Sequence, residues 1–145
     1  QAVQRVLGKK VSYSIWTNKS HNHALYDGEY YMHRKGATPA GKGERGIIPA
    51  NMKEGSFLVV GKGNPAFLES SSHGAGRIMS RRGARDTISM ESFEQAMEGV
   101  VGTVSTKTVD EAPQAYKEIS EVLSAQKESI SVVKHLLPLI NWKGG

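Results

Sequence analysis

The pattern of hydrophobic and polar positions predicts several short strands along the chain. The pair Asp27-Gly28 favours a hairpin turn between two of them. The continuous apolar run over 56–60 is typical of a strand buried on both faces, and Pro138 interrupts the last predicted strand. The predicted strands cover residues 11–16, 25–26 paired with 29–33, 56–60, 100–104 and 129–139.

Helical patterns are fewer. Residues 1–7 are typical of the end of a helix closed by Gly8, and Ser89 is placed to cap a helix that ends at Gly99. The clearest helix opens at 110–113, where acidic residues and a proline occupy the first turn. Its predicted apolar face consists of Tyr116, Ile119, Val122 and Leu123. Strands and helices together predict an α+β fold with mixed sheets and flanking helices.

Composition and charge narrow the classes of protein. The chain has 145 residues, which suits one domain, and a formal net charge of +5 with a pI near 9.5. This excess favours polyanionic partners such as nucleic acids or nucleotides. Zero cysteines exclude disulfides and thiolate metal sites. No apolar run reaches membrane-spanning length, so we expect a cytoplasmic protein without a membrane partner. The chain begins at Gln1, which leaves a missing upstream segment open.

The stretch 70–81 carries the strongest candidate chemistry. His73 lies between three serines and a Gly-Ala-Gly run, which we expect to open a helix with Arg77 and Arg81 on one face. Small residues and a helix N-terminus expose amide groups to anions, and a neutral imidazole can attack phosphorus. The stretch therefore predicts a phosphate site with a nucleophile beside it. The alternative is a tight glycine turn followed by solvated arginines.

Three other places carry weaker signals. His21 and His23 lie two apart and can face one metal ion if that segment is extended; the alternative is a polar loop. The basic cluster 33–40 resembles a phosphate contact at the end of a strand, and also an ordinary strand terminus. Tyr116 is either a core residue or an aromatic plate under a nucleobase.

Six blocks of the sequence resemble the RtcB family of GTP-dependent RNA ligases. They occur in the family's order and span nearly the whole chain. The block around the candidate nucleophile resembles the family's guanylylation motif. The blocks are Ser20-His21-Asn22, 33–38, 46–49, His73-Gly74-Ala75-Gly76-Arg77 with 79–81, Asp110-Glu111-Ala112-Pro113 with 115–117, and Lys143-Gly144.

The resemblance implies a ligase that uses GTP and Mn²⁺ to join an RNA 3′-phosphate or 2′,3′-cyclic phosphate end to a 5′-hydroxyl end. Such a reaction belongs to tRNA splicing or RNA repair. It makes His73 the nucleophile that carries GMP, and His21 a manganese ligand. The guanylate site implied by the resemblance comprises His21, Asn22, Pro49, Ala50, Asn51, Met52, Ser56, His73, Gly74, Ala75, Gly76, Tyr116 and Lys143. The implied RNA-phosphate contacts are Lys35, Arg77 and Arg81.

Two departures from the family pattern qualify this assignment. Family members usually carry Gly-Ser where this chain has Ala50-Asn51. The family's other metal ligands, which include a cysteine, belong to a region upstream of the matching blocks. We therefore interpret residues 1–145 as the C-terminal portion of the RtcB-like fold, which needs the upstream part of the ligase for activity. An activating accessory protein is a further candidate partner, and a noncatalytic RNA- or nucleotide-binding module is the alternative function.

Overall fold

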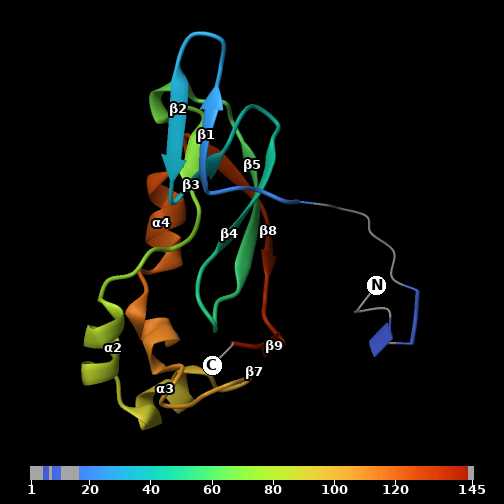
Figure 1. Ribbon diagram of the computed structural model, residues 1–145. Helices are drawn as coiled ribbons and strands as arrows, with labels where there is room; N and C mark the ends of the chain where they lie inside the picture. Colours follow the sequence, from blue (N-terminus) through green and yellow to red (C-terminus); the bar gives the residue numbers. More distant parts are fainter. Residues whose placement is uncertain (1–4, 7, 11–16, 144–145) are drawn as a thin grey trace.

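The protein is described here by a computed structural model that places residues 5–6, 8–10 and 17–143 (Figure 1). The predicted strand over 11–16 lies outside the described residues, as does most of the predicted helix end over 1–7. Within the described residues, no helix has the length and apolar character needed to cross a bilayer.

Small antiparallel sheets form most of the described fold. Strands β1 and β2 form a hairpin, β3 pairs with β6, and β5 lies between β4 and β8; only the pair β7 and β9 is parallel among the described residues. The strands are β1 (Asn22–Tyr26), β2 (Tyr31–Lys35), β3 (Ala37–Pro39), β4 (Arg45–Pro49), β5 (Ser56–Gly61), β6 (Ser70–Ser72), β7 (Val101–Gly102), β8 (Ile130–Leu136) and β9 (Ile140–Asn141).

Apart from η1, the described helices lie in the second half of the chain, and the α-helices lie to one side of the three-stranded sheet (Figure 1). Ser89 caps α3 through a hydrogen bond that its side chain accepts from Ser92 N, as predicted. The helices are the 3-10 turns η1 (Pro65–Phe67), η2 (Val109–Glu111) and η3 (Pro113–Ala115), and the α-helices α2 (Arg81–Thr87), α3 (Met90–Ala96) and α4 (Ile119–Ala125). Together with the sheets they confirm the α+β class.

The predicted hairpin is confirmed. Its closing pair is Tyr26 and Tyr31, and the Asp27 side chain accepts hydrogen bonds from the amides of Glu29 and Tyr30. This arrangement is an Asx turn, and it satisfies the amides of the loop locally. The apolar run over 56–60 is also a strand, in the middle of its sheet, but only Val59 of that run is fully buried. The expectation of burial on both faces was therefore too strong.

The helix expected to open in the Gly-Ala-Gly run is wrong. Gly76 has a φ of +77°, which a right-handed helix does not allow, and the first helical residue is Arg81, capped by Ser80. Arg77 lies before the helix and forms an isolated antiparallel bridge with Tyr116. The two arginines therefore do not share a helical face.

The helix expected to open at 110–113 is wrong in its extent. Ala112 is held in an extended conformation with ψ near 146°, as expected for a residue before Pro113, so the chain forms two 3-10 turns instead of one helix. Tyr116 follows them in extended backbone, and α4 begins only at Ile119. Tyr116 is thus freed from the apolar face of the helix.

Two clusters of buried side chains hold these elements together. In the first, Ile119 of α4 packs with Ile48, Val59 and Ile130 of the three-stranded sheet. In the second, Phe93 packs with its neighbours Met52, Met97, Val109 and Ala112. Burying such side chains provides about 1.5–3 kcal/mol each. The clusters hold the loop over 50–55 and the segment over 109–116 in place, and residues of both line the pocket described below.

Candidate functional site

A pocket of about 760 Å³ brings together most of the residues that the resemblance assigned to guanylate binding. It lies between the loop joining β4 and β5, the glycine run after β6, and the segment around β9. The predicted residues that line it are Pro49, Ala50, Asn51, Met52, Ser56, His73, Gly74, Ala75, Gly76, Tyr116 and Lys143. Arg77 and Glu111 also line it.

One wall of this pocket is a closed loop held by Asn51. Its side-chain oxygen accepts hydrogen bonds from the amides of Lys53 and Glu54, at 3.0 and 2.9 Å. Ala50 N donates to Gly55 O, and Gly55 N donates to Asn51 O. The departure at Ala50-Asn51 therefore places an asparagine where its side chain organises the turn.

The hydrogen bonds of His73 determine which ring nitrogen is available. Its Nδ1 lies 2.9 Å from the carbonyl oxygen of Gly36, which can only accept. In the neutral imidazole, Nδ1 therefore carries the proton and Nε2 has the lone pair. The His73 amide also donates to this carbonyl, at 3.3 Å. Gly36 has a φ of +66°, a conformation that glycine adopts without strain.

His21 and Asn22 lie beside the pocket, although they do not line it. The His21 ring stacks on the His73 ring, with centroids 4.8 Å apart and an angle of 12° between the planes. The Gly36 amide donates both to His21 O and to the Asn22 side chain. Gly36 thus joins the three polar residues that sequence reasoning singled out separately.

A complete metal site is not assembled by the described residues. Among them, no group of three or more His, Cys, Asp or Glu side chains is placed to hold a metal ion. His23 lies beside the Arg34 guanidinium, with Nε2 3.5 Å from Nη1, while His21 stacks on His73. The exposed ring of His21 is suited to contribute one nitrogen ligand, and its role as a manganese ligand stays a prediction.

Tyr116 lies at one wall of the pocket and is tied down by its hydroxyl. The hydroxyl donates to Glu111 Oε2 at 2.7 Å and accepts from Arg77 at 3.3 Å. Burial raises the pKa of Tyr116, and the bond to the Glu111 carboxylate raises it further. The Arg77 guanidinium lies over the ring, 5.1 Å from its centroid. The ring is thereby fixed in position without packing in a core cluster.

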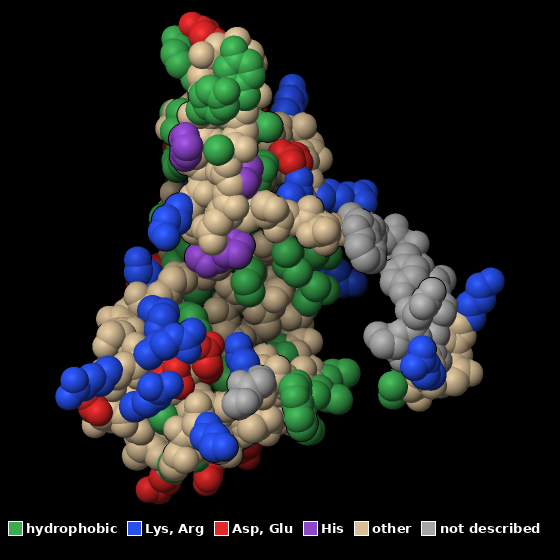
Figure 2. Space-filling view, viewed as in Figure 1, with side chains coloured by type: hydrophobic (Ala, Val, Ile, Leu, Met, Phe, Trp, Pro, Cys, Tyr) green, Lys and Arg blue, Asp and Glu red, His purple; other side chains and the backbone are tan. Residues whose placement is uncertain are grey.

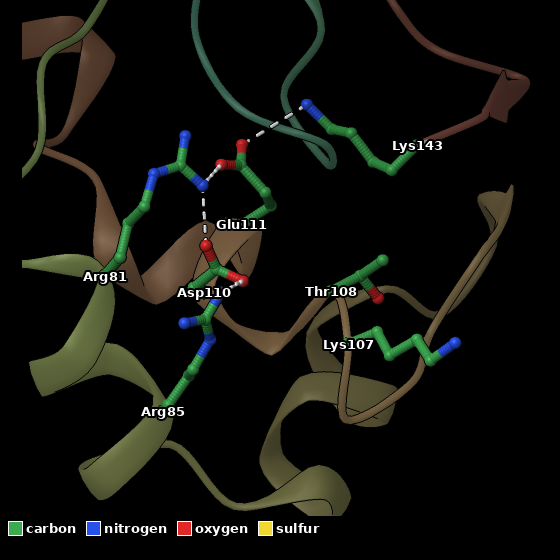
Figure 3. A pocket seen from close by; sticks show the side chains of 7 residues that line it. All are labelled: Arg81, Arg85, Lys107, Thr108, Asp110, Glu111 and Lys143. Carbon is green, nitrogen blue, oxygen red and sulfur yellow. Dashed lines mark hydrogen bonds and ion pairs between the residues drawn. The ribbon is translucent and has the colours of Figure 1, made fainter. Parts of the chain in front are cut away.

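A second pocket of about 800 Å³ adjoins the first and has charged walls (Figure 3). Arg81 donates to Asp110 at 2.6 Å and to Glu111 at 2.6 Å, and Arg85 lies 3.2 Å from Asp110. Lys143 lies 3.4 Å from Glu111. Glu111 and Lys143 line both pockets. In the space-filling view, basic and acidic side chains gather on this part of the surface, below the histidines (Figure 2).

The two acidic residues remain charged in this setting. Burial acts to raise the pKa of Asp110, but the Arg81 hydrogen bond and the charge of Arg85 outweigh it, so the pKa lies below its ordinary value. Burial likewise opposes ionisation of Glu111, yet the hydrogen bond from Tyr116 and the charge of Lys143 hold its pKa down. Hydrogen bonds to Asp110 and Glu111 in turn raise the pKa of Arg81.

The three predicted RNA-phosphate contacts are placed differently. Lys35 is exposed at the end of β2, directly before Gly36. Arg81 is exposed at the second pocket but already pairs with two carboxylates. Arg77 donates one hydrogen bond from each guanidinium nitrogen to the protein, to Met79 O, Tyr116 Oη and Asp110 O. Their contacts with RNA stay predictions.

Sequence reasoning missed the residues that organise the site. Gly36 was assigned no role, and Asp110 and Glu111 were interpreted as acidic residues at a helix N-terminus. The signal that was available is charge complementarity, because the basic stretch over 77–85 has these two carboxylates as its partners. The pairing spans about thirty positions in sequence, so local patterns do not reveal it.

Comparison with known proteins identifies the family. The model of the family described as tRNA-splicing ligase RtcB matches residues 1–144. The chain belongs to the RtcB family. It is 41% identical over 116 residues to the RNA-splicing ligase RtcB of Escherichia coli K12, an alignment that covers 80% of this chain and 28% of the relative.

Two other RtcB proteins show similar coverage. The RNA-splicing ligase RtcB of Mycobacterium tuberculosis is 35% identical over 133 residues, which cover 78% of this chain and 31% of the relative. The tRNA-splicing ligase RtcB of Nanoarchaeum equitans is 33% identical over 146 residues, which cover 84% and 30%. The chain thus spans less than a third of the length of these RtcB relatives.

Proposed function

We propose that this chain is the nucleotide-carrying portion of an RNA ligase that joins a 3′-phosphate or 2′,3′-cyclic phosphate end to a 5′-hydroxyl end with GTP. The observation that carries the proposal is the hydrogen bond from His73 Nδ1 to the Gly36 carbonyl, which in the neutral ring directs the lone pair to Nε2, at the pocket. Family membership and the convergence of the predicted guanylate residues on one pocket support it.

The first step of the proposed reaction loads the histidine. His73 Nε2 attacks the α-phosphorus of GTP, so that a P–N bond forms, the bond to the β-phosphate oxygen breaks and pyrophosphate leaves. The Gly36 carbonyl stabilises the positive charge that develops on the ring by accepting from Nδ1. Residues 74–76 line the pocket, and because the Ala75 amide donates to Pro49 O, the amides of Gly74 and Gly76 are the ones suited to face the phosphate.

The next steps transfer GMP. An oxygen of the RNA 3′-phosphate attacks the phosphorus held by His73, and the P–N bond breaks. The RNA 5′-hydroxyl then attacks the activated 3′-phosphate, a phosphodiester forms and GMP leaves. A manganese ion with His21 among its ligands supplies Lewis-acid stabilisation of the phosphoryl oxygens when bound. In this proposal, the additional polypeptide that longer RtcB relatives have supplies the remaining metal ligands and binds the 5′ end of the substrate.

Specific residues of the pocket are assigned to the guanosine. The exposed side of the Tyr116 ring stacks on the base, since Arg77 and Glu111 already hold the ring in place. Lys143 reaches the base from the end of the chain, and Asn22 lies beside the GMP. The loop over 49–52 and Ser56 form the opposite wall. An activating accessory protein remains a candidate partner in this proposal.

The decisive experiment detects the covalent adduct. The chain, supplemented with the additional polypeptide of a longer relative, is incubated with GTP labelled at the α-phosphate and Mn²⁺. We expect an acid-labile, alkali-stable adduct, as a P–N bond requires. His73→Asn is the matched variant, because its side-chain amide can still donate to Gly36 O while Nε2 is lost.

The outcomes separate the two functions. An adduct that persists unchanged in His73→Asn would overturn the proposed nucleophile. Tight binding of guanosine nucleotides with no adduct in the supplemented protein would instead support the alternative, a noncatalytic RNA- or nucleotide-binding module.

A further inference from the structure

One face of the β1–β2 hairpin carries a continuous strip of exposed side chains. In an antiparallel pair, residues directly opposite each other point to the same side of the sheet. The register pairs Tyr26 with Tyr31, Ala24 with His33, and Asn22 with Lys35. These six residues, which we call the hairpin strip, therefore lie on one face and are all exposed.

The opposite face of the hairpin is anchored to the protein through Arg34, whereas Leu25, closer to the turn, is 51% exposed. This face carries His23 with Arg34, and Leu25 with Met32. Arg34 is buried and donates to the Ser70 hydroxyl and to Leu68 O, which ties this face to the start of β6 and to the segment before it. The hairpin thus has one anchored face, and the hairpin strip is left on the other.

The two ends of the hairpin strip differ in chemistry. At the turn, the rings of Tyr26 and Tyr31 contact each other with centroids 4.9 Å apart, and they are 55% and 70% exposed. At the other end, Lys35 directly precedes Gly36, whose carbonyl accepts from His73. Lys35 lies four positions after Tyr31 along the strand, a length of about 13 Å.

We propose that the hairpin strip binds the single-stranded end of the RNA substrate and leads it to His73. This proposal rests on the proposed ligase function. The tyrosine rings stack on bases set back from the end, while His33 and Lys35 contact the phosphates nearer the nucleophile. Aromatic rings combined with a basic groove are the general solution for binding single strands without sequence preference.

RNA fits the hairpin strip better than a polypeptide does. A protein interface places its apolar residues at the centre and its charges at the rim, whereas here the aromatic pair lies at the turn and charge increases toward the reactive histidine. The two acidic residues near the turn do not form part of the strip: Asp27 accepts from loop amides, and Glu29 lies in the loop itself.

The test compares three variants of the strip in an RNA-binding assay. The probe is a short single-stranded RNA with a 3′-phosphate and a 2-aminopurine base near that end. Tyr26→Leu/Tyr31→Leu keeps apolar side chains but removes the rings, and we expect its affinity to fall about fivefold or more. Tyr26→Phe/Tyr31→Phe keeps the rings and binds like the unaltered chain. Stacking also quenches 2-aminopurine, and this quenching is lost only in the leucine variant.

A lysine pair tests the charged end of the hairpin strip. Lys35→Ala is expected to lower the slope of log affinity against log salt by about 0.7, as for one phosphate contact on a single strand. Lys127→Ala removes an exposed lysine after α4, whose side chain lies outside the strip, and leaves the slope unchanged.

Guanylylation distinguishes failure of this proposal from failure of the proposed function. It uses GTP and no RNA, so it reports on His73 alone. If the supplemented chain forms no adduct, the ligase function fails first. If the adduct forms and the leucine variant binds RNA as tightly as the unaltered chain, the strip proposal is overturned by itself. If the leucine variant instead no longer forms the adduct when the additional polypeptide is added, the strip is a protein-docking face. The proposal is then also overturned.

Discussion

Replacing Asp110 with asparagine tests the charged cluster between the two pockets. Asp110 is only 2% exposed, and its carboxylate is held by Arg81 at 2.6 Å and Arg85 at 3.2 Å. Asparagine has nearly the same shape but carries no charge, and its NH₂ group cannot accept from an arginine. The change therefore removes one ionic partner while leaving the volume of the buried site the same.

The expected loss of stability follows from the exposure of the partners. Leaving one member of a fully buried ion pair alone costs about 3–5 kcal/mol. Here the arginine side chains are 63% and 54% exposed, so both can regain water when Asp110 is neutralised. A hydrogen bond to a charged group is worth about 1.5–3 kcal/mol. We expect Asp110→Asn to lower the free energy of unfolding by about 1–3 kcal/mol, or the Tm by about 3–9 °C.

The assay is urea denaturation at two pH values. The pKa of Asp110 is lowered in the folded state, so its stabilising effect is complete above the unfolded value of about 3.9 and is lost as pH falls through the folded value. The gap between the two proteins should therefore be full at pH 7 and narrow below about pH 3.9. Asp86→Asn is the matched control. Asp86 pairs with Arg82 on the exposed side of α2, the helix that also carries Arg81 and Arg85, and this substitution should cost about 0–0.5 kcal/mol.

Two results would refute this reasoning. One is an Asp110→Asn protein as stable at pH 7 as the unaltered chain, which would mean that the arginines gain as much from water as from the carboxylate. The other is a gap that stays constant as the pH falls, which would show that shape or packing, and not charge, determines the effect.

Two further changes probe the walls of the first pocket, which Gly55 and Tyr116 line. Gly55→Ala should lower the free energy of unfolding by more than about 2 kcal/mol, because φ is +80° and the new Cβ would lie 2.2 Å from Leu136 O. Gly43→Ala, with a similar φ of +78° but open space around it, should cost only about 1 kcal/mol in the same denaturation experiment. A larger loss in Gly43→Ala than in Gly55→Ala would contradict the clash. Tyr116→Phe should cost about 1 kcal/mol through the lost bond to Glu111, yet retain guanosine nucleotide affinity by calorimetry, whereas Tyr116→Ala should lose most of it. Equal losses in the two variants would argue against stacking.

The parts of the fold that the sequence predicted well are those set by neighbouring residues. The hairpin follows from Asp27-Gly28, because the aspartate binds the amides of its own loop. The cap by Ser89 follows from the same kind of local bond. Such features need no information from distant parts of the chain.

The errors occurred where distant contacts override local preference. The spacing of Arg77 and Arg81 suggested a helix, but a backbone bridge to Tyr116 keeps Arg77 extended. The same bridge holds Tyr116 out of the predicted helix, after Pro113 has already broken the run. The segments around Arg77 and Tyr116 therefore form a backbone bridge to each other, about forty residues apart in sequence, instead of local helical hydrogen bonds.

The candidate site was only partly accessible to reasoning from the residues alone. His73 and its glycines were identified by their chemistry, but the joining of residues 49–56, 116 and 143 into one pocket rested on the resemblance to a family. No local pattern indicates that Gly36 supplies the carbonyl that selects the tautomer of His73. A backbone acceptor has no side chain, and therefore no signature in the sequence.

Glu111 lines both pockets, and its carboxylate interacts with Arg77, Arg81, Tyr116 and Lys143. An anion that draws Lys143 away on one side strips this carboxylate of a neutralising neighbour. Its ion pairs with Arg77 and Arg81 then carry more of the neutralisation. The two pockets are therefore electrostatically coupled through the Glu111 carboxylate. An anion bound in one pocket changes the charge that its neighbour presents.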